Sequence, residues 1–108
     1  MATPSDRAPA RQSAAPSQPE WNQEQAIEYE VAREAITALM AFRSQWIFDE
    51  EQKRSPDHAA IARWNSESAA FAAELRNLHV RDHENVARIC RTYGPEIQRL
   101  DALERPRG

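Results

Sequence analysis

Apolar residues recur along two segments of the chain at alternating steps of three and four positions. The first segment contains Ala32, Ala35, Leu39, Phe42 and Trp46; the second contains Ile61, Trp64, Ser68, Phe71, Leu75 and Leu78. On an α-helix this spacing places each set on one face. Between the segments, Ser55 and Pro56 can end one helix and begin the next. The pattern therefore predicts a long antiparallel helical hairpin.

The first predicted helix covers about residues 20–53. Two capping pairs compete for its start, Ser17 with Glu20 and Asn22 with Gln25. The second predicted helix covers about residues 56–78. We expect Ser55 as its N-cap and Pro56 at its first position, where the missing backbone N–H of proline costs no hydrogen bond.

The apolar pattern changes phase after Leu78. Continuing the stripe would place Asp82 and Asn85 on the apolar seam. A break in the helix, with Asp82 as a new N-cap, removes this conflict and is the favoured interpretation. The alternative is one continuous helix through to Tyr93, with the polar residues inside the seam.

Two short helices are expected after the break. The first covers about residues 83–93 and ends at Gly94, which suits a left-handed cap. Pro95 then begins the second, at about residues 96–104, and we expect residues 105–108 to be frayed. The predicted fold is thus all-α: a long hairpin and two short helices in a small helical bundle.

The composition limits the class of protein. A chain of 108 residues suffices for one domain, which we place at residues 20–104. Residues 1–19 are rich in Pro, Ala, Ser and Gln and hold no large apolar side chain after Met1, so we expect a disordered tail. Cys90 is the sole cysteine. It forms no internal disulfide and suits a reducing cytoplasm, where we expect the protein.

Charge and hydropathy argue against two classes of partner. The net charge of -3 gives no electrostatic reason to bind nucleic acid or an anionic membrane. No apolar run reaches the roughly 18 residues of a membrane span, and no apolar segment typical of a secretory signal follows the first residues. We expect no association with a membrane.

His79, His83 and Cys90 are the candidate metal ligands. A spacing of four places two imidazoles on one helix face, and the cysteine would fall on the same side. With Asp82 as an N-cap, however, His79 precedes the helix and the shared face is lost. Residues 79–83 also hold Asp where the zinc pattern H-x-x-E-H has its glutamate. The favoured interpretation is a polar turn with Cys90 in the core, and we predict no metal site.

The sequence holds no recognisable set of catalytic residues. The Glu-x-x-His pairs of di-iron bundles are absent, because Ser55, Arg76 and Val80 stand three positions before the three histidines. Both glycines fall at predicted helix or chain ends, so there is no glycine-rich loop to bind phosphate. We predict a protein without catalytic residues or a cofactor, and not an enzyme.

DNA binding is the alternative function, through the third and fourth predicted helices. The candidate contacts are Arg81, Arg88, Arg91 and Arg99. A short helix carrying arginines resembles the recognition helix of a helix-turn-helix regulator. Asp82 and Glu84 nevertheless occupy the start of that helix, where base contacts usually lie, and the domain is acidic. Surface ion pairs are the simpler interpretation of these arginines.

The first helix carries more apolar surface than the second can cover. Trp46, Ile47 and Phe48 are consecutive, so their side chains point in directions roughly 100° apart. In a small domain such an excess is typical of an association surface, and Trp, Tyr and Arg dominate interface energetics. The residues that we predict at the interface are Met40, Phe42, Trp46, Ile47, Phe48 and Trp64.

These features together favour a non-enzymatic protein that acts by protein–protein association. The small acidic helical build suits an inhibitor, antitoxin-like or immunity-like protein, or a phage or plasmid accessory factor, that occludes a larger protein. A small subunit of a complex is another version, and a homodimer is an alternative use of the same face. The excess of arginine over lysine, with abundant alanine, suggests a bacterial origin.

Overall fold

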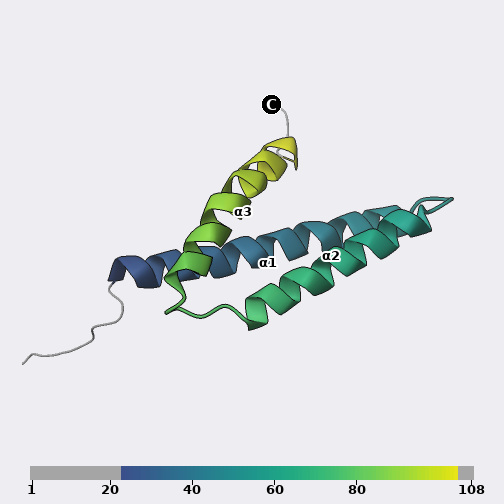
Figure 1. Ribbon diagram of the computed structural model, residues 1–108. Helices are drawn as coiled ribbons and strands as arrows, with labels where there is room; N and C mark the ends of the chain where they lie inside the picture. The colour runs from purple at the N-terminus through teal and green to yellow at the C-terminus, as the bar shows by residue number, and fades with distance from the viewer. Residues whose placement is uncertain (1–22, 105–108) are drawn as a thin grey trace, which may run out of the picture.

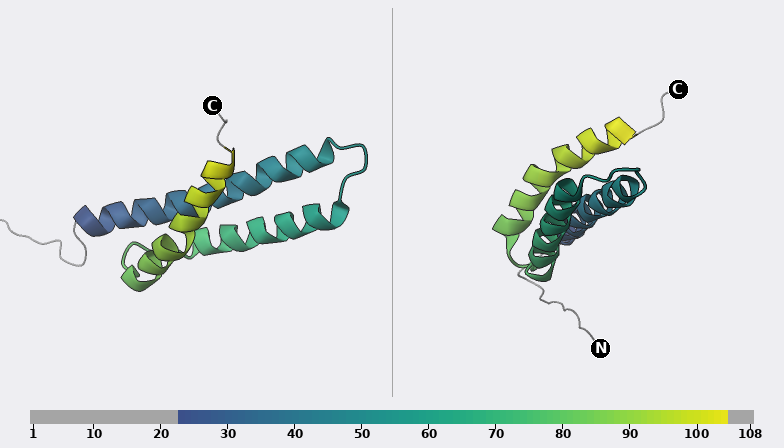
Figure 2. Two further views of the ribbon diagram at one scale, coloured as in Figure 1. Left: turned by 90° about the horizontal axis from the view of Figure 1, so that it is seen from above. Right: turned by 90° about the vertical axis from the view of Figure 1, so that its right-hand side faces the viewer.

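The computed structural model describes residues 23–104, which form three α-helices and no strand (Figure 1). Helix α1 spans Gln23–Glu51, α2 spans His58–Arg76 and α3 spans His83–Glu104. As the pattern predicts, all regular secondary structure in residues 23–104 is helical, and α1 and α2 run antiparallel as a hairpin. Helix α3 crosses α1 at a steep angle (Figures 1 and 2). Within residues 23–104, no helix combines the length and hydropathy that a membrane span requires.

The N-cap of α2 is Asp57, so the prediction of Ser55 is wrong. The Oδ1 atom of Asp57 accepts a hydrogen bond from the backbone N–H of Ala60 at 3.1 Å. The backbone N–H of Asp57 in turn donates to the Oε2 atom of Glu50 in α1 at 2.9 Å. This second bond attaches the cap to the preceding helix, and Pro56 consequently lies outside α2.

The break between α2 and α3 lies where the change of phase predicts it. The backbone N–H of the C-cap residue Asn77 bonds to the carbonyl of Ala73 at 3.1 Å. The Oδ1 atom of Asp82 then accepts from the backbone N–H of Asn85 at 3.2 Å, as expected of an N-cap. A continuous helix through to Tyr93 is therefore excluded.

Gly94 and Pro95 do not interrupt α3, and the prediction of two short helices is wrong. Proline cannot donate the backbone hydrogen bond that a helix interior normally makes. The helix continues because both of its halves pack against α1. Ile89 in the first half is fully buried, and Leu100 in the second is only 6% exposed. Tertiary packing here outweighs the local tendency to break the helix.

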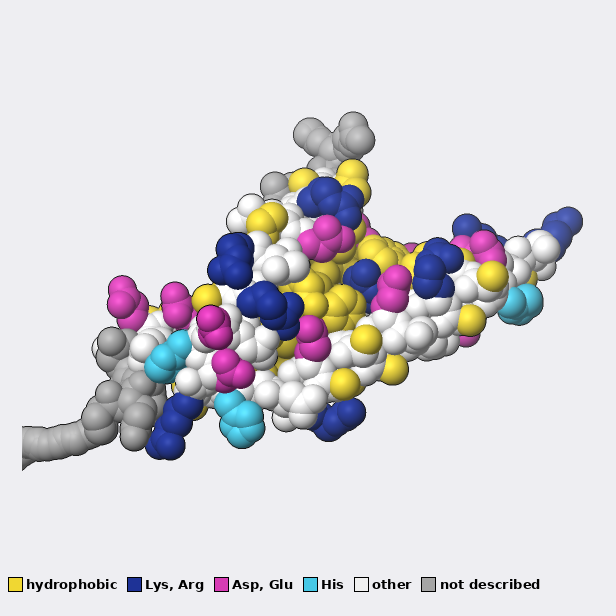
Figure 3. Space-filling view, in the orientation of Figure 1, with side chains coloured by type: hydrophobic (Ala, Val, Ile, Leu, Met, Phe, Trp, Pro, Cys, Tyr) yellow, Lys and Arg dark blue, Asp and Glu magenta, His cyan; other side chains and the backbone are white. Residues whose placement is uncertain are grey.

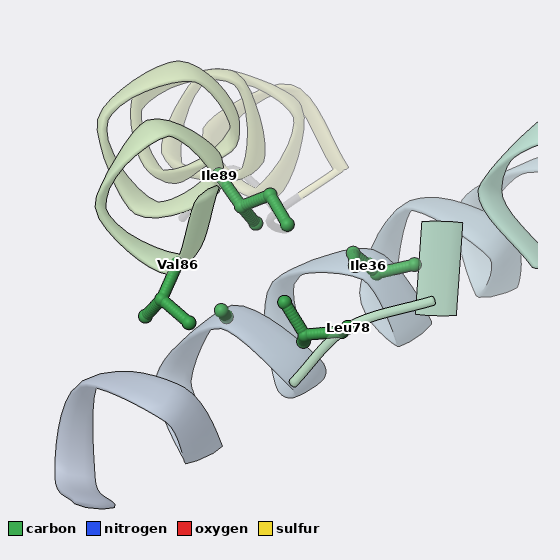
Figure 4. Close-up of a cluster of buried hydrophobic side chains, with 5 residues drawn as sticks. Ile36, Leu78, Val86 and Ile89 are labelled. Atoms are coloured by element: carbon green, nitrogen blue, oxygen red, sulfur yellow. The ribbon is translucent and has the colours of Figure 1, made fainter. Parts of the chain in front are cut away.

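The hydrophobic core lies at one end of the hairpin, where all three helices approach one another. Its buried residues are Ala32 and Ile36 of α1, Leu78 of the connecting segment, and Val86 and Ile89 of α3 (Figure 4). Helix α1 packs against both α2 and α3, whereas the backbones of α2 and α3 do not pack against each other. Beyond the core, α3 leaves α2 and crosses one face of the hairpin toward α1 (Figure 2).

Candidate protein-binding surface

Hydrophobic side chains gather in the angle that α3 makes with the hairpin (Figure 3). We call this region the aromatic surface. Its rings belong to all three helices and are Phe42 and Trp46 of α1, Trp64 and Phe71 of α2, and Tyr93 of α3. All five side chains are partly exposed. A third helix packed along both α1 and α2 would have buried them, but α3 crosses the hairpin instead.

Ring contacts connect these side chains in two groups. The Trp46 ring lies between those of Phe42 and Trp64, with centroid separations of 6.1 Å and 5.7 Å. Phe71 and Tyr93 meet edge to face, with their centroids 5.5 Å apart and their planes at 87°. Such tilted and edge-on geometries are the favoured ones for aromatic pairs. The surface is thus ordered, with its rings fixed by one another.

Arg43 joins the two aromatic groups. Its guanidinium carbon lies 4.9 Å from the centroid of the Trp46 ring and 5.0 Å from that of Phe71. The Nε atom donates to the Oε1 atom of Glu67 at 2.9 Å, and Nη1 donates to the backbone carbonyl of Leu39 at 3.2 Å. Only 12% of this side chain is exposed. A planar cation thus takes a place where a closed bundle would put an apolar residue.

A polar network fixes the angle between α2 and α3. The hydroxyl of Tyr93 donates to the Oε1 atom of Glu74 at 2.8 Å, and Arg88 donates from Nη2 to the Oε2 atom at 3.1 Å. Burial raises the pKa of Tyr93, and the neighbouring carboxylate of Glu74 raises it further. The hydroxyl therefore stays protonated and continues to donate this bond well above neutral pH.

A pocket of about 360 Å³ lies beside the indole rings of Trp46 and Trp64, at the end of the hairpin away from the core. We call it the aromatic notch; it is lined by Trp46, Asp49, Glu50, Lys53 and Trp64. The carboxylate of Glu50 is held by the ammonium group of Lys53 at 2.9 Å and by the backbone N–H of Asp57 at 2.9 Å. These two hydrogen bonds, the Lys53 bond first, lower the pKa of Glu50.

The structure brings only some of the predicted interface residues together. Phe42, Trp46 and Trp64 lie together, and Phe48 is 58% exposed on α1. Met40, in contrast, packs against the buried core, and Ile47 is half-buried. The aromatic surface also contains residues that the sequence analysis did not select, Arg43, Phe71 and Tyr93. Phe71 already belonged to the second apolar stripe, whereas nothing in the pattern marks Arg43 as an interior cation.

The candidate DNA contacts are dispersed among acidic partners. Arg88 bonds to Glu74 and Asn85, and Arg99 bonds to Glu96 at 2.7 Å. Arg91 shares a surface hollow with two acidic residues, Asp82 and Glu84, and Arg81 is exposed before α3. The pair of short helices that the DNA-binding alternative requires is a single helix. Acidic residues thus interrupt the surface that these arginines form, and DNA binding stays a prediction.

The candidate metal ligands are separated by the N-terminus of α3. His79 lies before the helix, and the Nδ1 atom of His83 faces the side-chain amide of Gln25 at 3.3 Å. The thiol of Cys90 lies 3.5 Å from the backbone carbonyl of Glu28. Burial raises its thiol pKa, and the charge of Glu28 adds to this effect. Residues 23–104 contain no group of three or more side chains placed to hold a metal ion.

The aromatic surface is the part of the described structure that combines exposed rings, a concave shape and charged groups at its edge. Flat apolar rings that are already held in place lose little conformational entropy when a second surface covers them. Trp and Arg side chains in such a setting are typical anchors of protein interfaces. No protein-family model matches this chain, and neither does any curated protein or solved structure.

Proposed function

We propose that this protein acts by associating with another protein through the aromatic surface. The partner would pack into the angle between α3 and the hairpin and cover the rings of Trp46 and Trp64. Phe48 points about 200° away from Trp46 around α1, so it lies outside this contact. No chemical step is assigned to the protein; its action is to bind and to occlude.

One observation carries this proposal: α2 and α3 diverge over the second half of α1 and leave its aromatic residues partly uncovered. Taking a fully exposed Phe side chain to complete burial contributes about 1.5–3 kcal/mol, so each of these partly buried rings would contribute a fraction of that on association. These gains oppose the entropy that association costs, and that cost is smaller where the rings are already held in place. The ring contacts and the Arg43 stacking supply that order.

The biological role that fits this mechanism is that of a small accessory protein. An inhibitor, antitoxin-like or immunity-like protein of a bacterial cytoplasm, a phage or plasmid factor, and a small subunit of a complex would all use a surface of this kind. These roles rest on the small, acidic, helical build and on analogy. A homodimer in which two copies cover each other's rings is the alternative.

Site-specific photo-crosslinking tests the proposal. The full chain is produced in its native host with p-benzoylphenylalanine in place of Thr92, which is exposed and lines a hollow with Arg43, Phe71 and Tyr93. The matched control carries the same group in place of Ala69, which is exposed on α2. We expect one adduct of defined mass from position 92 and none from position 69. An adduct of twice the chain mass would identify the homodimer, whereas no adduct at position 92, or equal adducts at both, would contradict the proposal.

A further inference from the structure

We propose that the aromatic notch binds an arginine side chain of the partner protein. This inference rests on the proposed function, because it names the chemical group that a partner would place beside Trp46 and Trp64. The pocket of about 360 Å³ opens to solvent beside the aromatic surface. It is large enough for a guanidinium group with part of its aliphatic stem, and its walls provide both rings and carboxylates.

The charge of the notch favours a cation. Lys53 lies in the field of three carboxylates, those of Glu50, Asp57 and Asp49. Only the Glu50 carboxylate forms an ion pair with it. The carboxylate of Glu104 lies close by, bonded to the neutral indole N–H of Trp46 at 3.3 Å. The three carboxylates of Asp49, Glu50 and Glu104 thus outnumber the two cations near the pocket, Lys53 and the Arg63 that lies beside Trp64. An incoming positive charge is therefore attracted to it.

The rings of the notch already bind guanidinium groups of this chain. Arg43 lies 4.9 Å from the centroid of the Trp46 ring, and Arg63 lies 5.7 Å from that of Trp64. Both distances are within the range of an attractive cation–π contact, which is strongest at tryptophan. The charge of Arg43 is neutralised by its ion pair with Glu67, so it does not cancel the negative charge of the notch.

The hydrogen-bonding capacity of Asp49 selects arginine over other side chains. Its carboxylate is exposed at the edge of the notch and accepts a hydrogen bond from the Gln45 amide at 2.9 Å. A carboxylate has about four acceptor positions, which leaves room for the parallel N–H groups of a guanidinium. A lysine would offer a point charge but no planar stacking. An apolar side chain would remove water from the carboxylates without replacing its hydrogen bonds.

Nuclear magnetic resonance of the full chain tests this inference with two small probes. N-acetyl-arginine amide carries the guanidinium group, and N-acetyl-citrulline amide has nearly the same shape without the charge. We expect the arginine probe to shift the indole N–H signals of Trp46 and Trp64 in a saturable way, and to bind about five-fold more tightly than citrulline. Trp→Phe variants assign the two signals.

Two carboxylate variants locate the binding. Asp49→Asn should abolish the difference between the arginine and citrulline probes, whereas Glu30→Gln, an exposed change on the same helix, should preserve it. Equal binding of the two probes, shifts confined to signals outside the notch, or an undiminished preference in Asp49→Asn would overturn the inference.

The two experiments separate the inference from the proposed function. A crosslinked adduct at position 92 without any preference for the arginine probe would keep the protein association and remove the notch as an arginine site. Binding of the arginine probe without any adduct would show that the notch recognises a cation but would contradict its use by a protein partner.

Discussion

The indole Nε1 of Trp46 donates a hydrogen bond to the Oε2 atom of Glu104 at 3.3 Å, and this contact joins the last turn of α3 to the second half of α1. The contact requires that α3 continue past Gly94 and Pro95 in one direction. A chain that turned at these residues, as their sequence suggests, would not bring Glu104 to this ring. The position of the aromatic surface thus depends on the continuity of α3.

Replacing Gly94 tests that continuity. A Cβ atom built at this position meets no atom within 4 Å, and the residue lies inside a helix. Gly94→Ala should therefore raise the free energy of unfolding by about 0.5–1 kcal/mol, because alanine has less chain entropy to lose. Urea denaturation measures the change. A loss of stability would indicate that Gly94 is the left-handed cap that the sequence alone suggests.

The location of the core predicts a contrast between two isoleucines of α1. Ile36 is fully buried, whereas Ile27 is 55% exposed. Ile36→Ala should lower the free energy of unfolding by about 2–5 kcal/mol, since it removes buried methyl groups and leaves a cavity. Ile27→Ala makes the same chemical change at an exposed position and should cost well under half as much. Similar losses for both variants in thermal or urea denaturation would place the core elsewhere.

The N-cap assignment predicts different effects at two neighbouring positions. Asp57→Ala removes the side-chain bond to the Ala60 N–H and should cost about 1 kcal/mol of stability. Ser55→Ala should change the stability little, because Ser55 is exposed and does not cap α2. Equal losses in chemical denaturation, or a larger one for Ser55→Ala, would restore Ser55 as the cap.

The lowered pKa of Glu50 predicts a dependence of stability on pH. The Lys53 and Asp57 N–H bonds stabilise the ionised carboxylate in the folded state. This stabilisation is complete above the ordinary carboxyl pKa of about 4.3 and is lost as the pH falls through that value toward the lower folded-state pKa. Wild-type protein should therefore be more stable than Glu50→Gln at neutral pH, and the difference should shrink on acidification.

Melting temperatures from about pH 3 to pH 7 measure this difference. Glu30→Gln serves as the control, because Glu30 is an exposed carboxylate on the same helix. A difference between wild type and Glu50→Gln that stays constant over the whole range would show that the carboxylate charge of Glu50 has no part in it.

The hairpin could be predicted from the sequence because the two apolar stripes have a helical period over many residues. Local signals were less decisive. Ser55 and Asp57 are both good N-cap residues, and Asp57 takes the position because its backbone N–H also donates to Glu50 of the preceding helix. Capping preferences within α2 cannot predict this bond to another helix.

The shape of the candidate site could be predicted only in part. Trp46 and Trp64 stood on matching stripes, so their meeting across the hairpin followed from the pattern. The interior position of Arg43 did not, since arginine in a sequence indicates the surface. The continuity of α3 could not be predicted either, because the burial of Leu100 and the contact of Glu104 with Trp46 outweigh the helix-breaking tendency of Gly94 and Pro95.

We infer that the uncovered aromatic surface of α1 and α2 binds a protein. Native mass spectrometry of the full chain isolated from its host, as wild type and as Thr92→Arg, distinguishes a bound chain from an isolated one. Thr92 is exposed and lines a hollow with Arg43, Phe71 and Tyr93, so a long charged side chain there should obstruct the surface and leave the melting temperature nearly unaltered. We predict a complex of fixed composition, heavier than the 12.4 kDa chain, that dissociates in the variant. A wild-type protein found only at the mass of one chain, or a complex unaffected by Thr92→Arg, would rule out association through this surface.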